Sequence, residues 1–264
     1  MSIVLFINGA LGLRVLEYVS GLTECRLSVV VLNSVSKRSS NYLEEVESIL
    51  DAKNLDLPIL EWHGEIADSA ELDFLFKGVD FGVSALFGHI LPKGVVGKFP
   101  GGVLNMHPSL LPIGRGADPI PWGIIERQKH GVTLHLMDQN LDTGDIVFQK
   151  EITTDCTMNA GEIYEIAVSE LFSVFSRLFV SWINDEIEPR PQSKSPYSQH
   201  KSRDLDLLKI INDNEVGTFG DFVRRMQAIS FSNGSLPKYM DSEGKIWEIT
   251  IKIQEPSNNE QESV

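Results

Sequence analysis

Short apolar runs alternate with amphipathic segments through the first half of the chain. The runs at Ser2–Ile7 and Arg26–Leu32 are each followed by apolar residues at helical spacing, and further runs lie at Phe81–Ala85 and Gly102–Asn105. Strands that helices bury on both faces have this continuous apolar character. The alternation therefore predicts an α/β fold with a mostly parallel sheet.

The second half of the chain changes character at Gly131. Two strand-like runs follow, separated by a turn at Asp142-Thr143-Gly144, and a long helical stripe then extends from Ile163 to Trp182. The stretch 188–196 contains three prolines and reads as a boundary. We therefore predict a main domain over residues 1–190 that carries the catalytic site, a small C-terminal domain over 191–254 that ends in a β-hairpin, and a disordered tail over 255–264.

Charge and cysteine content restrict the partners. The 264 residues include 23 Lys+Arg against 37 Asp+Glu, and the formal charge of -14 disfavours a broad nucleic-acid interface. Cys25 and Cys156 lie far apart and no His/Asp/Glu set has metal-ligand spacing, so we expect neither a disulfide scaffold nor a metal. The N-terminus lacks a basic region, and no apolar run reaches the roughly 20 residues that span a bilayer. We therefore expect a cytoplasmic protein without membrane contact.

Three polar residues near predicted strand ends form a candidate catalytic group. Asn105 and His107 are two residues apart, so a strand would direct both side chains to one face, and Asp142 follows the next strand. Asn105 could donate to a developing oxyanion, His107 could carry a proton near neutral pH, and Asp142 could orient the imidazole. On their own the same residues are also typical of a structural strand end and a turn cap, and both interpretations stay open.

Three motifs around these residues resemble the folate-dependent formyltransferase family. Its first motif is similar to Asn105-Met106-His107-Pro108-Ser109-Leu110-Leu111-Pro112, and its second is similar to residues 131–138 with Leu141-Asp142-Thr143-Gly144-Asp145. The stretch that the family places beside the pterin is similar to Phe87-Gly88-His89-Ile90-Leu91-Pro92. Together the motifs resemble the family closely over residues 75–185.

The resemblance implies a Rossmann-like catalytic domain that binds 10-formyltetrahydrofolate as co-substrate in a cleft at the strand ends. It carries over Asn105, His107 and Asp142 as the catalytic residues. Asn105 and protonated His107 would stabilise the oxyanion as an amine attacks the formyl carbon, and Asp142 would support His107. The folate would lie against Phe87, His89, Ile90, Leu91, Gln139 and Thr143.

Family resemblance leaves the acceptor amine open. Methionyl-tRNA is disfavoured by the acidic charge, and glycinamide ribonucleotide enzymes resemble only the part of the chain before the proline-rich boundary. Residues 197–254 resemble the small C-terminal part of sugar N-formyltransferases. This implies a nucleotide-linked amino-dideoxy sugar as acceptor, dTDP-linked before GDP-linked, used for surface polysaccharide such as O-antigen, and a homodimer. A catalytically inactive nucleotide-sugar binding protein is the alternative from another class.

Candidate acceptor contacts come from several places in the sequence. His200, Lys201 and Arg203 form a compact cationic cluster after the boundary, and such a cluster is suited to binding a pyrophosphate. The alternative interpretation is that these side chains form a solvated face of a linker. The complete set of candidates is Asn8, Gly9, Arg115, Trp122, His200, Lys201 and Arg203.

Other histidines and aromatic residues receive structural interpretations. His135 is expected to pack near the site, whereas His63 and His130 lie in polar stretches and are expected at the surface. The aromatic residues Phe231, Tyr239 and Trp247 are expected in the core of the hairpin, with stacking on a base as the alternative.

Overall fold

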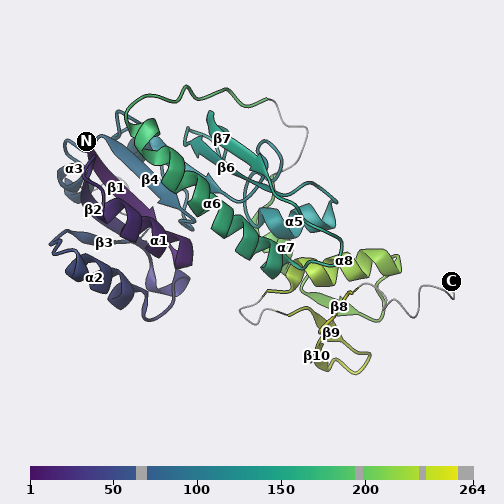
Figure 1. The fold of residues 1–264 in the computed structure, drawn as a ribbon. Helices are drawn as coiled ribbons and strands as arrows, with labels where there is room; N and C mark the ends of the chain where they lie inside the picture. Colours follow the sequence, from purple (N-terminus) through teal and green to yellow (C-terminus); the bar gives the residue numbers. More distant parts are fainter. Residues whose placement is uncertain (64–69, 194–198, 232–235, 255–264) are drawn as a thin grey trace.

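Seven strands form one continuous sheet in the computed structural model, which describes residues 1–63, 70–193, 199–231 and 236–254. The sheet order is β3-β2-β1-β4-β5-β6-β7, parallel through β5 and antiparallel for the last two strands (Figure 1). The prediction of a mostly parallel α/β sheet is therefore confirmed. The strands are β1 Ser2–Ile7, β2 Arg26–Asn33, β3 Ile59–Trp62, β4 Phe81–Ala85, β5 Val103–His107, β6 Gly131–Leu136 and β7 Ile146–Glu151.

Helices bury both faces of this sheet. Ile3, Leu5 and Ile7 of β1 pack in the cluster that contains α1 (Gly9–Ser20), α2 (Tyr42–Ala52) and α6 (Ala160–Ile183). The alternate residues Val4 and Phe6 pack in a second cluster, with α3 (Ala70–Leu75) and α4 (Lys93–Val96). Period-two alternation with apolar residues on both faces explains the continuous apolar runs in the sequence.

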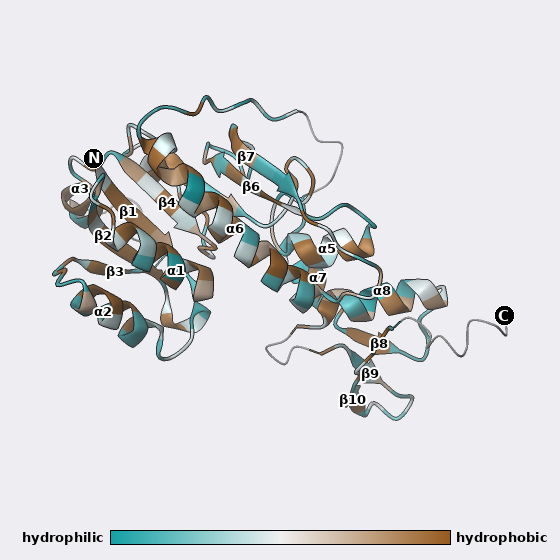
Figure 2. Ribbon diagram, viewed as in Figure 1, coloured by the Kyte–Doolittle hydropathy of each residue, from teal (hydrophilic) through white to brown (hydrophobic). Residues whose placement is uncertain are grey.

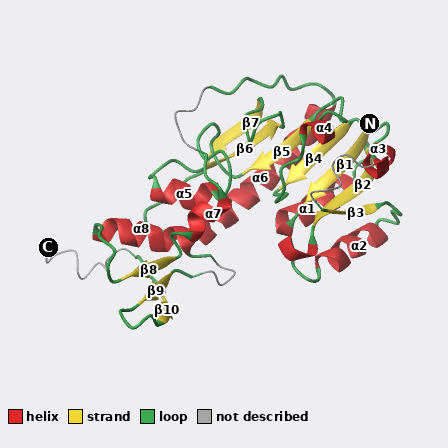
Figure 3. Ribbon diagram, turned by 180° about the vertical axis from the view of Figure 1, so that it is seen from behind, coloured by secondary structure: helices red, strands yellow, loops and turns green. Residues whose placement is uncertain are grey.

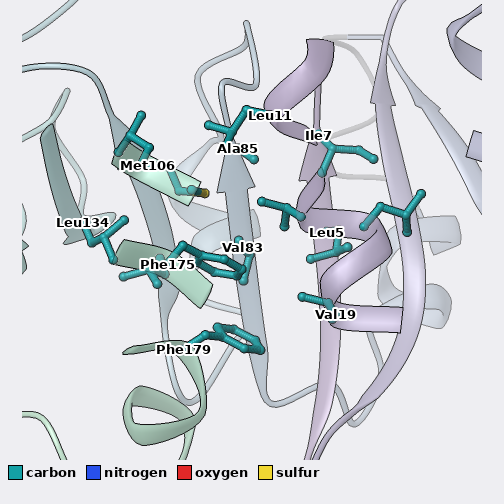
Figure 4. Close-up of a cluster of buried hydrophobic side chains, with 14 of the residues drawn as sticks. Leu5, Ile7, Leu11, Val19, Val83, Ala85, Met106, Leu134, Phe175 and Phe179 are labelled. Carbon is teal, nitrogen blue, oxygen red and sulfur yellow. The ribbon is translucent and has the colours of Figure 1, made fainter. Parts of the chain in front are cut away.

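The long helix α6 lies across the sheet and supplies much of the first cluster. Phe175 and Phe179 project from it toward Val83 of the sheet (Figure 4). Its start is fixed by a capping box, in which the Asn159 side chain accepts from the Glu162 N–H and the Glu162 carboxylate accepts from the Asn159 N–H. By length and composition α6 is apolar enough to cross a membrane, but its apolar face packs in the core, and its exterior carries hydrophilic residues (Figure 2).

A second, smaller sheet lies away from the first (Figure 3). Its order is β10-β9-β8, and the antiparallel pair β9 (Lys238–Met240) and β10 (Ile246–Glu248) is the hairpin that the sequence predicts. The helix α8 (Phe219–Ile229) packs against α5 (Pro119–Ile125) and α6 and so joins this part to the main body. The remaining elements are the 3-10 turn Val35–Lys37, α7 (Ser202–Asp206) and β8 (Ile210–Asn212), while the predicted tail at 255–264 lies outside the described residues.

Candidate active site

A cavity of about 790 Å³ opens beyond the carboxyl ends of β4 and β5. Its lining brings together parts of the chain that are distant in sequence. They include the strand ends, the segments 86–91 and 116–121, and the loop 137–142 between β6 and β7. Tyr164 of α6 also lines the cavity, as do four residues of the C-terminal part: His200, Lys201, Ser202 and Phe231. The catalytic group predicted from the sequence, Asn105, His107 and Asp142, lies together in this lining.

Strand periodicity directs the first two of these residues into the cavity. Leu104 and Met106 of β5 pack in the cluster beneath α6, so Asn105 and His107 face the other way. The strand extends two residues beyond the end predicted from the sequence and carries His107 to the rim of the sheet. In the antiparallel neighbour β6, His135 lies directly opposite Asn105.

His135 determines how the Asn105 carboxamide is oriented. The His135 Nδ1–H donates to the carbonyl of Leu136 at 2.8 Å, so in the neutral ring Nε2 accepts from the Asn105 Nδ2 at 3.0 Å. An amide NH₂ has two donors, and His135 takes only one of them. His135 is 1% exposed, which agrees with the expectation of a packed residue near the site.

His107 is held at both ring nitrogens. Its Nε2–H donates to the carbonyl of Gly114 at 2.8 Å, and its Nδ1 lies 3.8 Å from a carboxylate oxygen of Asp142. Burial lowers the pKa of His107 below its ordinary value and outweighs the opposing effect of Asp142. The ring therefore favours the neutral form, with Nδ1 unprotonated, at neutral pH.

Asp142 lies in the loop between β6 and β7 in a left-handed conformation, with φ of 53°. One carboxylate oxygen accepts the backbone N–H of Gly116 at 2.9 Å, and the other lies 3.6 Å from His135 Nε2. Burial alone would raise its pKa, but His107, His135 and the Gly116 N–H more than offset burial and hold the pKa well below its ordinary value. Asp142 is therefore a buried carboxylate that stays ionised beside a neutral imidazole.

Five of the six residues expected beside the folate line the cavity: Phe87, His89, Ile90, Leu91 and Gln139. The sixth, Thr143, lies outside the lining because its hydroxyl donates to the Asp138 carboxylate at 2.7 Å and closes the loop on itself. The Nε2 atom of His89 is buried and has no hydrogen-bond partner among the described residues.

The expected acceptor contacts divide into two groups. His200 and Lys201 line the cavity. Trp122 is outside the lining, but its ring stacks on that of His200, with the ring centroids 3.7 Å apart and an angle of 6° between the ring planes. His200 Nε2 also approaches the Glu126 carboxylate at 2.7 Å. The other candidates, Asn8, Gly9, Arg115 and Arg203, are outside the lining.

Some contributors to the site carry no clear sequence signal. Tyr164 and Phe231 line the cavity with their rings 6.3 Å apart, so Phe231 lies at the cavity and not in the hairpin core. Gln192 contacts the Asp142 loop from inside the proline-rich stretch.

The expectation that His130 lies at the surface is wrong. His130 is 8% exposed and packs against Gly123 of α5.

The histidines and carboxylates of the site are not arranged as metal ligands. Within residues 1–63, 70–193, 199–231 and 236–254, no group of three or more His, Cys, Asp or Glu could hold an ion. The side-chain groups gathered at the cavity base are a carboxamide, imidazoles and a carboxylate.

Comparisons with known proteins agree with this geometry. Residues 64–171 match the formyl transferase family model. Methionyl-tRNA formyltransferase from Syntrophus aciditrophicus is 36% identical over 202 residues, which are 73% of this chain and 64% of that protein. The chain spans between 43% and 64% of the length of the first curated relatives that it matches.

Solved structures resemble the chain over different lengths. A 4-N formyltransferase from Francisella tularensis superposes with a TM-score of 0.80 at 18% identity, over 97% of this chain and 98% of that one. An N-formyltransferase from Helicobacter canadensis, in complex with folinic acid and dTDP-3-aminofucose, gives 0.64 at 20% identity over 89% and 82%. Glycinamide ribonucleotide transformylase 1 from Symbiobacterium toebii gives 0.58 at 20% identity over 73% and 94%.

The fold and the cavity define a doubly wound α/β protein with a ligand site beyond the carboxyl ends of its parallel strands. Within that class, the matched family model and the shared architecture identify the chain's fold as the formyltransferase fold. Residues 64–171 thus match the formyl transferase family, and nearly the whole chain shares the fold of a solved formyltransferase.

Proposed function

We propose that the protein transfers a formyl group from 10-formyltetrahydrofolate to the amino group of a nucleotide-linked amino-dideoxy sugar. One observation carries the proposal: a single cavity has Asn105, His107 and Asp142 at its base and residues of the C-terminal part, among them His200 and Phe231, in its wall. A transfer enzyme needs donor and acceptor in one enclosure, and this cavity is large enough for two ligand parts to meet.

The wall between β4 and the β6–β7 loop suits a pterin. Phe87, Leu91 and Met137 give it apolar surface, and Gln139 and Leu141 bring loop backbone to the same wall. The buried Nε2 of His89, which lacks a partner among the described residues, offers a hydrogen-bonding atom there. The bound folate would supply the activated formyl carbon.

The residues at the base divide the acid–base work. The free Nδ2 hydrogen of Asn105 donates to the formyl oxygen as negative charge develops on it. Neutral His107 accepts the proton of the attacking amine at Nδ1, where the Asp142 carboxylate then stabilises the charged ring. The ring gives this proton to N10 of the folate as the bond between N10 and the formyl carbon breaks. The protonated His107 expected from the sequence is thus the state after proton uptake, because burial disfavours it beforehand.

The acceptor assignment draws support from the C-terminal part. The Francisella 4-N formyltransferase shares the fold over 97% of this chain, whereas the glycinamide ribonucleotide transformylase shares it over 73%. The first curated methionyl-tRNA relatives match over no more than 64% of their length, and the formal charge of -14 is unfavourable for tRNA. These points favour a sugar acceptor over the two alternatives.

The proposal includes a cellular setting. A dTDP-linked sugar is the first choice and a GDP-linked sugar the second, with the product used in surface polysaccharide such as O-antigen. We place the enzyme in the cytoplasm and expect it to act as a homodimer.

A substrate panel tests the proposal. The protein is incubated with 10-formyltetrahydrofolate and, separately, dTDP-, GDP- and UDP-linked amino sugars, glycinamide ribonucleotide and methionyl-tRNA, and each product mass is measured. The expected result is gain of one formyl group on a nucleotide sugar alone. Formylation of glycinamide ribonucleotide or methionyl-tRNA instead would reject the sugar acceptor, and binding of a nucleotide sugar without any transfer would support an inactive binding protein.

A further inference from the structure

Gln192 lies in the connection that leaves α6 and returns over the end of β7 toward the C-terminal part (Figure 1). Two residues earlier, Arg190 pairs with Ile146 at the start of β7, and each backbone N–H donates to the other carbonyl at 2.8 and 2.9 Å. This pairing holds the connection beside the loop that carries Asp142.

The Gln192 carboxamide is used at both ends. Its Nε2 donates to the carbonyls of Asp142 and Gly144 at 3.1 and 2.7 Å, and its Oε1 accepts from Arg115 Nη2 at 2.6 Å and Nε at 3.3 Å. Two carbonyls on one side and a guanidinium on the other fix which amide atom is nitrogen. Gln192 therefore ties the segment at Arg115 to the Asp142 loop.

The two tied segments also determine where the Asp142 carboxylate lies. Gly116, which follows Arg115, donates its N–H to that carboxylate. Asp142 itself has a positive φ, a conformation that is uncommon among non-glycine residues. The loop consequently depends on outside contacts to keep this conformation.

We propose that Gln192 is a positioning residue that holds the Asp142 carboxylate against His107. It acts through the loop, because it is outside the cavity lining and touches the backbone on either side of Thr143. The inference rests on the proposed function, in which Asp142 stabilises the charged form of His107. On this proposal, the segment that connects α6 to the C-terminal part also helps to set the rate of formyl transfer, because it carries Gln192.

Gln199 offers a matched control on the same loop. Its Nε2 donates to the carbonyl of Leu141, the residue before Asp142, through one longer contact of 3.3 Å. Removing this amide removes one exposed contact and leaves the pair of bonds from Gln192 intact.

Kinetics of three variants give the first test. Gln192→Ala is expected to lower kcat about 10- to 100-fold with the acceptor KM changed less than threefold, since small misplacements of reacting groups have effects of this size. Gln192→Glu keeps an acceptor for Arg115 but places a carboxylate against two carbonyl oxygens, and it should lose as much. Gln199→Ala should stay within about twofold of the parent rate, because the loop keeps both bonds from Gln192, to the carbonyls of Asp142 and Gly144. Full activity of Gln192→Glu would show that only the Arg115 contact matters and would overturn the proposal.

A second readout does not require turnover. In the ligand-free protein, the imidazole of His107 is titrated by NMR in the parent and in Gln192→Ala, with circular dichroism showing that both are folded. Because Asp142 raises the pKa of His107, its displacement should lower that pKa further. A folded variant, Gln192→Ala or Gln192→Glu, with an unchanged titration or an unchanged kcat overturns the proposal. If the parent protein formylates no acceptor, the proposed function fails, and the titration still decides the role of Gln192.

Discussion

The two walls of the cavity come from parts of the molecule that are built differently. Asn105 and His107 stand on β5, whose five residues are all buried between helices. His200 and Lys201 lie beside the C-terminal part, whose small sheet leaves Ile246 51% and Trp247 48% exposed. The proposed catalytic residues are thus carried by the buried core, while the proposed acceptor contacts lie on short elements that can change without disturbing the main sheet.

The largest expected effect concerns the core wall. His107→Asn removes the ring that accepts the amine proton, so kcat should fall by about 10³-fold or more, as acid–base groups typically contribute 10²–10⁴. Binding of the folate, followed by fluorescence, should be unchanged within threefold, because the pterin wall is intact. Turnover within tenfold of the parent would contradict the role given to His107.

The next largest effect is a difference in stability between the core of the main sheet and the small C-terminal sheet. Phe179 of α6 is fully buried, with its ring 4.7 Å from that of Phe175, and Phe179→Ala should lower the free energy of unfolding by about 3–5 kcal/mol. Trp247→Ala in β10 removes an exposed ring that contacts Lys245 and Asp241, and should cost less than about 1 kcal/mol. Urea denaturation measures both, and equal losses would show that the small sheet is as tightly packed as the main one.

Substitutions in the cavity wall that contains His200 and Lys201, where we propose that the acceptor binds, should change the KM for the acceptor. His200→Ala removes the ring stacked on Trp122 and the contact to Glu126, so the KM for the nucleotide sugar should rise about tenfold, which is about 1.4 kcal/mol. Its kcat should stay within threefold, since the catalytic base is untouched. Arg203→Ala, at a side chain that is 80% exposed, should have the smaller effect. The reverse order would restore the pyrophosphate role that the sequence suggested for Arg203.

The smallest effect is a pH dependence of stability. Burial lowers the pKa of His130 below its ordinary value of 6.5, so the unfolded chain takes up a proton there more readily than the folded one. Its contribution is complete above about pH 6.5 and declines as the pH falls below that value. His130→Asn should flatten the fall in the free energy of unfolding, measured by urea denaturation between pH 7.5 and 5.5, by at most about 1.4 kcal/mol per pH unit.

Sequence reasoning reached the elements that are long and strongly periodic. The strand Phe81–Ala85 and the helical stripe from Ile163 to Trp182 agree with the structure because local pattern determines both. The four-residue strand Ile59–Trp62 was missed, since so short a run carries little periodicity, and β8 gains its strand character from parallel pairing with β9. Such pairing is a tertiary effect that no local window contains.

The site residues likewise divide into those that a local motif identifies and those whose role depends on contacts with distant parts of the sequence. Asn105, His107 and Asp142 were found because they lie inside two recognisable motifs, and the cavity lining brings them together. Gln192 was not found, because its contacts are with residues 48 and 50 positions away and its own surroundings are proline-rich. Thr143 shows the opposite case, in which a motif position is used within its own loop.

The pairing of Arg190 with Ile146 has a consequence for self-association. β7 is an edge strand of the main sheet, and an exposed edge can template the addition of a strand from another chain. The returning connection pairs with the beginning of that edge through two backbone hydrogen bonds. The same segment that carries Gln192 therefore also shields part of the sheet from aggregation, and a proteolytic cut within it would expose that edge.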